Sequence, residues 1–389
     1  PLLLESEIAR AKLYARENRN RDAFALFDAV DKRGDERAAA QAIYSPVEAG
    51  LQTKTMPVAT AINMLEGLRY RWRGDALELK TLRKLGALYF QTQHWRDGLQ
   101  VLRTAAQNFP EDESARRAND DMRAAFVQLY LKGAADKMSP VQALALFYDF
   151  IDLTPIGPDG DEMIRRMADR LMAVDLLGPA AKLLDYQVDK RLDGVARAQV
   201  AAKLAMIQLL DHKPKDALAS IRNTRVAGLP DDVNHERMIL EARSLAALKQ
   251  WDAALDTIAV DEAPDSQRLR ADIYWESGNW PVAGQKAEEL LGDSWDGKTP
   301  LSDGDRQEVM RAAIAYALAN DEPSLDRLRD HFMPKMKASK DASAFTVVTQ
   351  NISAQGAAFR DQAGQVASID TLEAFMKDFK KRYDSNAVN

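Results

Sequence analysis

Small and apolar residues recur along the middle of the chain at an interval of 37 positions. The interval separates four alanines: Ala143, Ala180, Ala217 and Ala254. Apolar residues also stand twelve positions before and four positions after each of them: Leu131, Ala168, Ala205 and Ala242, then Phe147, Leu184, Ile221 and Ile258. A fixed period of this size is typical of one supersecondary unit stacked repeatedly, so the pattern predicts a solenoid rather than a closed globule.

The spacing within each period predicts a pair of antiparallel helices. Twelve residues between two small positions leave room for the rest of a first helix, a tight turn and the start of a second helix. Small residues suit the closest approach of two helices, so Ala205 and Ala217 are expected to lie at such a crossing. Pro140 and Pro214 precede the alanine by three positions, where a proline is tolerated in the first turn of the second helix. Tryptophans hold the corresponding place in other units: Trp95 and Trp251.

These residues resemble the tetratricopeptide family of helix–turn–helix repeats. One segment carries the resemblance through Leu85, Gly86, Tyr89, Trp95, Gly98, Leu102, Ala105 and Pro110, with Gly98 in place of the usual alanine. Further units are predicted at 161–197, 198–234, 235–263 and 264–292, and looser ones around Ala11, Tyr14, Ala23, Phe27, Ala61 and Leu65. The resemblance implies an all-α, right-handed superhelix of antiparallel helix pairs, with a concave groove that often binds peptide segments.

The organisation predicted is a repeat superhelix over 1–340 and capping helices over 341–389. In the second segment, an apolar stripe at helical spacing suits a helix that seals the last hydrophobic surface: Leu372, Phe375, Met376, Phe379 and Tyr383. A membrane-surface helix is the less favoured alternative, because so narrow a stripe usually docks on its own protein. Loops are predicted at 154–161 and 291–305, where Gly, Pro and Asp gather.

Composition narrows the classes of partner. The 389 residues carry a net charge of −6, which argues against general nucleic-acid binding. No apolar run approaches the roughly 18 residues that span a bilayer. Cysteine is absent, so disulfides and thiolate metal sites are excluded. The lack of cysteine slightly favours a bacterial periplasm or envelope, and a cytoplasmic location is the alternative.

Catalytic signals are few. The segment Gly292–Thr299 matches a phosphate-loop pattern, but it follows a predicted helix, contains Asp293 and Asp296 and is followed by Pro300, so we interpret it as a loop. The four histidines lack metal-ligand spacing, and His94 and His212 are expected in turns. Acids at 159–162 are expected to cap a helix, and Gly74 is expected to end one. We therefore predict no catalytic residues, metal or cofactor.

Arginine recurs on the first helices of the predicted units. Counting by the family's geometry, positions that face the concave surface are held by Arg83, Arg165, Asp169, Arg243, Arg268 and Asp272. A guanidinium group suits bidentate recognition of carboxylates, so these residues are candidates for binding a partner segment. The alternative is that Arg165–Asp169 and Arg268–Asp272 are ordinary helix pairs four residues apart.

A second candidate interface combines three arginines with two aromatics: Arg69, Tyr70, Arg71, Trp72 and Arg73. Flat amphipathic side chains are enriched at protein interfaces. The alternative is structural, with Trp72 covering a helix-pair core and the arginines lying over it.

The sequence thus predicts a non-catalytic scaffold that binds a partner protein or peptide in the groove of a helical superhelix. The alternative function is the helical, non-catalytic region of an envelope enzyme that acts on cell-wall glycan. Nucleic acid, a small-molecule cofactor and membrane contact are not expected.

Overall fold

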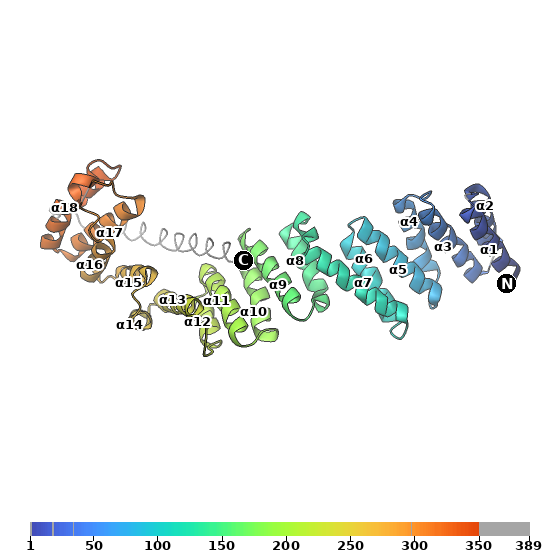
Figure 1. Ribbon diagram of the computed structural model, residues 1–389, viewed down its shortest axis with the longest axis horizontal. Coiled ribbons are helices and arrows are strands. Elements are labelled where there is room, and N and C mark those ends of the chain that lie inside the picture. The colour runs from blue at the N-terminus through green and yellow to red at the C-terminus, as the bar shows by residue number, and fades with distance from the viewer. Residues whose placement is uncertain (1, 18, 34, 297, 350–389) are drawn as a thin grey trace. The chain divides into compact units, whose positions relative to one another are not determined.

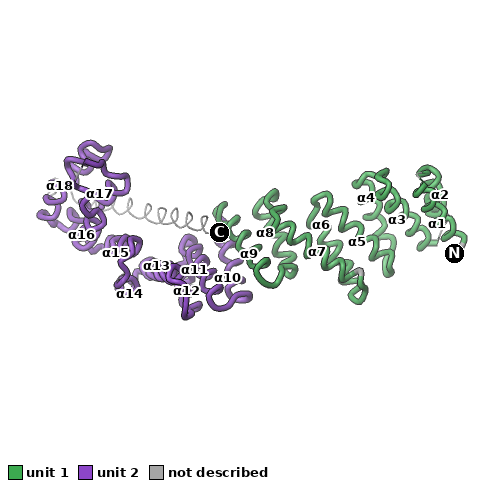
Figure 2. Tube along the Cα trace, viewed as in Figure 1, with its two compact units in different colours: residues 1–175 green, residues 176–389 purple. Residues whose placement is uncertain are grey.

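The computed structural model describes residues 2–17, 19–33, 35–296 and 298–349, and over these residues all regular structure is helical. The chain divides into two compact units, residues 1–175 (unit 1) and 176–389 (unit 2), shown in Figure 2. The all-α fold predicted from the sequence is confirmed, because the described residues form nineteen α-helices and two short 3-10 helices. None of these helices combines the length and apolar character needed to cross a membrane.

Within each unit, helices that follow one another along the chain pack side by side (Figure 1). Unit 1 contains α1 (Leu2–Arg16), α2 (Asn20–Arg33), α3 (Glu36–Gln52), α4 (Val58–Arg71), α5 (Ala76–Gln91), α6 (Trp95–Asn108), α7 (Glu113–Tyr130), η1 (Ala134–Lys137), α8 (Pro140–Asp149), η2 (Ile151–Leu153) and α9 (Pro158–Met172). Unit 2 contains α10 (Leu177–Lys190), α11 (Gly194–Leu210), α12 (Pro214–Arg222), α13 (Asp231–Ala247), α14 (Trp251–Thr257), α15 (Pro264–Glu276), α16 (Trp280–Leu291), α17 (Asp303–Ala319), α18 (Glu322–Met336) and α19 (Ala342–Thr349).

The repeating small residues are buried as the sequence predicts. All four period-defining alanines are 0% exposed: Ala143, Ala180, Ala217 and Ala254. Ala205 on α11 and Ala217 on α12 are both fully buried, and the two helices pack against each other. Second helices begin at the predicted prolines and tryptophans, since α8 starts at Pro140 and α14 at Trp251.

The turns inside these periods share a backbone feature that the sequence pattern did not reveal. Asp175, His212 and Lys249 have φ values of 61°, 54° and 60°, the left-handed conformation. Each stands five positions before a buried alanine, so these residues too recur every 37 positions. One left-handed residue costs about 1–2 kcal/mol for a side chain with a Cβ. For His212 and Lys249, the packing of α11 on α12 and of α13 on α14 must offset that cost.

Glycines mark the closest helix crossings. A Cβ atom on Gly86 of α5 would lie 2.6 Å from Cγ of Leu102 on α6. In unit 2, a Cβ on Gly284 of α16 would lie 2.6 Å from Cε1 of Tyr316 on α17. Leu102 and Tyr316 are 1% and 2% exposed, so neither has room to move away. These crossings therefore require glycine.

We predict that Gly86→Ala lowers the free energy of unfolding by ~1–3 kcal/mol, because the added methyl group overpacks the contact between α5 and α6. Gly67→Ala on α4 is the matched control, since nothing lies within 4 Å of a Cβ at that position. The control is expected to stabilise the protein by up to ~1 kcal/mol through helix propensity. Urea denaturation of both variants checks the pair, and equal effects would contradict the crossing argument.

Arginines on the first helices of unit 2 hold the end of the preceding second helix. Arg237 on α13 is 4% exposed and donates to the backbone oxygens of Ala198 at 2.5 Å, Ile221 at 2.7 Å and Thr224 at 3.2 Å. Arg270 on α15 donates in the same way to the oxygens of Ile258 and Asp261. Except for that of Ala198, which lies on α11, these carbonyls stand at or just after the C-terminus of a second helix, where partners within the helix are lacking. The guanidinium groups satisfy them and join neighbouring pairs.

Glu241 links α13 by ion pairs to the last residue of α12 and to the turn that follows it. Its carboxylate accepts from Nε of Arg222 at 2.8 Å and from Nη2 of Arg225 at 2.8 and 2.9 Å. Burial raises the pKa of Glu241, but the two arginines lower it by more, so the pKa lies below its ordinary value of 4.5. The folded state therefore favours the ionised carboxylate.

We predict that Glu241→Gln destabilises the protein by about 1.5–3 kcal/mol near neutral pH, the range for hydrogen bonds to charged groups. Because folding depresses the pKa of Glu241, its ionic contribution to stability is fully present above pH 4.5 and is lost as the pH falls through the pKa of the folded state. The difference in free energy of unfolding between wild type and variant, measured by urea denaturation, should thus become smaller as the pH falls below 4.5. Glu289→Gln, at an exposed pair with Lys286, is the control and should cost less than about 1 kcal/mol.

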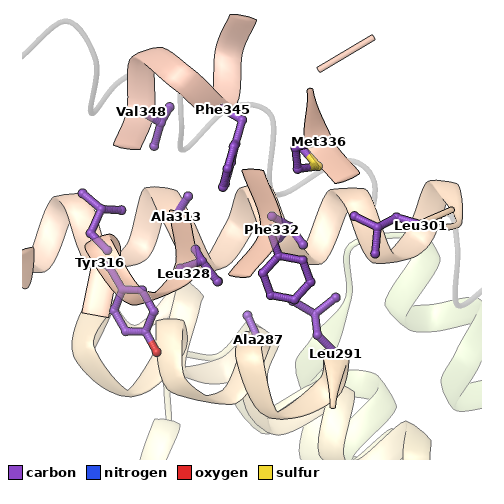
Figure 3. Packing of buried hydrophobic residues seen from close by; sticks show 13 residues of the cluster. Ala287, Leu291, Leu301, Ala313, Tyr316, Leu328, Phe332, Met336, Phe345 and Val348 are labelled. Carbon is purple, nitrogen blue, oxygen red and sulfur yellow. The ribbon is translucent and has the colours of Figure 1, made fainter. Parts of the chain in front are cut away.

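Helices α16 to α19 enclose a hydrophobic core at the end of the described chain (Figure 3). Phe332 of α18 lies among Leu291, Ala313 and Phe345, which come from three other helices. Phe345 is 0% exposed, so α19 covers the apolar surface of α17 and α18. The predicted stripe of the C-terminal helix, at 372–383, lies outside the described residues.

Two predicted boundaries are wrong. The loop expected over 154–161 is shorter, because α9 begins at Pro158, where the fixed φ of proline favours a helix start. Gly74 does not cap α4, whose C-cap is Trp72. The indole of Trp72 donates to Asp75 at 2.8 Å, and Asp75 also caps the N-terminus of α5. Helix α4 has therefore already ended before Gly74, and the side-chain hydrogen bonds of Asp75 fix the turn between α4 and α5.

Candidate functional site

Three of the predicted groove residues come together on the first helices of unit 2. Asp272 of α15 is 4% exposed and pairs with Arg311 of α17, with 2.8 Å between Oδ1 and Nη2. Arg243 of α13 and Arg268 of α15 lie within electrostatic range of this network. The guanidinium group of Arg311 also lies 5.3 Å from the ring centre of Trp275. We call Arg243, Arg268, Asp272, Glu308 and Arg311 the first-helix row.

The members of the first-helix row differ in how fully they are engaged. Oε1 of Glu308 accepts from Arg311 at 3.4 Å, whereas its buried Oε2 has no hydrogen-bond partner in the described chain. Burial raises the pKa of Glu308, which Arg311 lowers only in part. Arg268 is exposed and donates no hydrogen bond to any described residue. The row therefore consists of an internal ion-pair network with one uncommitted guanidinium group beside it.

The predicted groove residues of unit 1 do not form a comparable cluster. Arg83 of α5 contacts Asp121 of α7 at 3.2 Å. Arg165 of α9 pairs with Glu162 at 2.9 Å, a partner that the sequence analysis did not consider. Asp169 also takes part in an interaction. Partner binding by these three residues stays a prediction.

The second predicted interface borders a cleft in unit 1 of about 760 Å³. We call it the unit 1 cleft. Its lining comes from α4, the turn between α4 and α5, α5, α6, and the end and C-cap of α8: Arg69, Tyr70, Arg73, Glu78, Leu82, Gln100, Val101, Arg103, Thr104, Gln107, Asn108, Asp149 and Phe150. Arg71 and Trp72 are not part of this lining. Instead, Arg71 lies 3.5 Å from Asp31 of α2.

Two cleft arginines are held in fixed positions. Arg103 of α6 donates to the backbone oxygen of Asp149 at 2.8 Å and to Asp152 at 2.6 Å, and its guanidinium lies 4.2 Å from the ring centre of Phe150. Arg69 donates to the hydroxyl of Tyr70 at 2.7 Å and pairs with Glu66 at 2.9 Å. Arg73 forms no hydrogen bond or ion pair with the described residues. The cleft thus combines fixed and free guanidinium groups.

The fold is defined by three features described above: helix pairs, small residues at the helix crossings, and short turns between the helices. The described residues form an all-α fold in which consecutive helices pack together, and the repeating residues of the chain resemble those of the tetratricopeptide family. No family model and no curated protein matches the sequence. The fold therefore rests on the helix pairs of the chain itself.

The solved structures that match this chain have low overall similarity to it. The tetratricopeptide domain of P58(IPK) is 13% identical, covers 94% of this chain and 99% of its own, and has a TM-score of 0.27. A structure of Naa15/Naa10 bound to HypK-THB is 10% identical over 89% of this chain, with a TM-score of 0.36. This chain spans about half (54%) of the matched chain in that structure. A tetratricopeptide repeat protein from Parabacteroides merdae is 10% identical, covers 80% of this chain and 99% of its own, and has a TM-score of 0.22.

The described residues of the segment 292–299, which matches the phosphate-loop pattern, form a loop. This loop directs carbonyl oxygens at a cation and not N–H groups at an anion. Nζ of Lys335 on α18 donates to the backbone oxygens of Ser294 at 2.6 Å, Asp296 at 3.0 Å and Thr299 at 2.9 Å. Carbonyl oxygens thus converge on a cation, whereas a phosphate loop directs N–H groups at an anion. The interpretation of this segment as a loop is confirmed. Among the described residues, no three His, Asp or Glu side chains are grouped to hold a metal ion.

Sequence reasoning missed Glu308, Arg311 and Arg103. The first two lie on α17, beyond the last predicted unit, so the repeat count could not assign them to a helix face. Arg103 lies on α6, a second helix, whereas the groove positions predicted from the sequence lie on first helices. Its contacts with Asp149 and Asp152 join residues 46 and 49 positions apart, which no local pattern encodes.

We predict that Asp272→Asn destabilises the protein by about 3 kcal/mol, because it removes the shorter of the two ion pairs of Arg311 and leaves only Glu308 to pair with this charge. Asp326→Asn is the control, since Asp326 pairs with Arg329 at 2.5 Å on an exposed helix face. That variant should cost less than about 1 kcal/mol. Thermal melts of both variants check this, and similar losses would show that the network adds little to folding.

Proposed function

We propose that the protein is a non-catalytic interaction scaffold and that the first-helix row of unit 2 binds a segment of a partner protein. The observation that supports it is the state of Arg268, an exposed guanidinium group that has no hydrogen bond or ion pair within the described chain and lies beside the ion pairs of Arg311 with Asp272 and Glu308. A guanidinium group offers five donors in a planar fork that matches a carboxylate. The partner segment is therefore expected to place a carboxylate or successive backbone carbonyls on Arg268.

The network beside Arg268 supplies rigidity to this surface. Arg311 is linked to Asp272 and Glu308, and both links lie on helices rather than loops. A surface whose side chains are already fixed loses little conformational entropy on binding. Arg243 adds a second positive charge near Arg268, as expected of a surface that attracts an anionic group. Binding on such a surface needs no chemical step.

The predicted residues of unit 1 take a smaller part in this proposal. Arg83 and Arg165 each contact an acidic residue of the chain, so a partner would have to compete for them. Exposed ion pairs contribute about 1 kcal/mol or less, so this competition is weak but unfavourable. We therefore expect charge reversal at Arg268 to weaken binding more than charge reversal at Arg165.

We predict that Arg268→Glu weakens binding of the partner at least about tenfold, because it replaces the fork with a repelling carboxylate. The partner is first isolated from source-cell lysate with the unaltered chain as bait, and its affinity for each purified variant is then measured by calorimetry. Lys215→Glu is the matched control, since Lys215 is an exposed residue of α12 and the charge change is the same.

Equal affinities of the Arg268 variant and the control would place the contact away from the first-helix row. Hydrolysis of peptidoglycan by the purified chain would instead favour the cell-wall alternative. Circular dichroism of each variant is recorded beside the titration, so that a folding defect is recognised as such.

A further inference from the structure

The unit 1 cleft has more hydrogen-bond donors than its own acceptors can satisfy. Both carboxylates of the lining are already engaged. Glu78 is 5% exposed and accepts from the backbone N–H of Gly74 at 2.5 Å and from Asn108 at 3.1 Å. Asp149 pairs with Arg96. By contrast, Arg73 uses none of its five donors within the described chain.

We propose that the unit 1 cleft is a second binding site, which takes an acidic peptide segment of a partner protein. A ligand that fills a donor-rich cleft must supply acceptors, and Asp or Glu side chains with their backbone carbonyls supply them most densely. Arg73 would hold a carboxylate by its fork. Gln100 and Gln107, which lie seven residues apart on α6 and have no partner for their side chains in the described chain, would pair with the peptide backbone.

The remaining lining gives the segment an apolar contact. Tyr70 is 64% exposed, although the guanidinium of Arg69 lies 4.8 Å from its ring centre and its hydroxyl accepts a hydrogen bond from Arg69. An exposed aromatic ring held in one position offers contact area at little entropic cost. The matching segment therefore carries an apolar side chain close to its acidic residue.

The experiment is a selection of random twelve-residue peptides displayed on phage against the full chain. Selected peptides are synthesised with a fluorescent label, and their dissociation constants are measured by anisotropy for the unaltered chain, Arg73→Glu, Arg73→Lys and Arg71→Glu. Arg71 stands two positions from Arg73 and is outside the cleft, so its reversal is a control with the same charge change. The unaltered Arg268 of the other unit makes this test independent of the proposed function.

We expect acidic peptides to be enriched, with binding weakened about tenfold or more by Arg73→Glu and less than about twofold by Arg71→Glu. Arg73→Lys keeps the charge but loses the fork, so it should give an intermediate affinity. Enrichment of neutral or basic peptides that require Arg73 would overturn the acidic specificity. Equal loss with both reversals, or no peptide that depends on Arg73, would overturn the site itself.

Discussion

The close approach of helices at small residues is the constraint on which the rest of this structure depends. Gly86 and Gly284 lie where a Cβ atom would come within 2.6 Å of a buried neighbour. At the other crossings a buried alanine takes this place, as Ala217 and Ala254 do. So close an approach fixes the angle at which one helix packs on the next. This packing angle decides which side chains of successive first helices meet, and so where charged groups come together.

Once the helices are fixed, arginines divide into two classes by what lies opposite them. Arg237 and Arg270 face the C-terminal end of a preceding helix, and they donate hydrogen bonds to its carbonyl oxygens that join neighbouring helix pairs. Arg268 and Arg73 face solvent or a cleft, and their donors are unused in the described chain. A guanidinium group buried against carbonyls adds to stability, whereas one left without a partner attracts an anionic ligand. The same residue type thus serves folding in one place and, in our proposals, recognition in another.

The ion-pair network of unit 2 connects these two uses. Its charges are largely removed from water, a cost that is offset only when each member keeps its partner. The network consequently holds α15 and α17 in one arrangement, with Asp272 and Arg311 as the direct link. Arg268 lies beside a surface that does not need to reorganise when a ligand arrives. In the unit 1 cleft, the contacts of Arg103 with Asp149 and Asp152 have the same effect.

The period of 37 residues, read from the sequence alone, determined the all-α repeat fold, the buried alanines and the starts of several second helices. These features could be predicted because they depend on residues close together in the chain, whose burial leaves a regular pattern. The left-handed turn residues left no regular mark in the sequence, since the conformation falls on three different residue types, Asp175, His212 and Lys249, rather than on a repeated glycine. Only the tertiary structure decided which arginines are free. A guanidinium group is engaged or not according to the backbone and side chains that packing brings opposite it, often from 35 or more positions away, as Arg311 meets Asp272. No local pattern records that pairing.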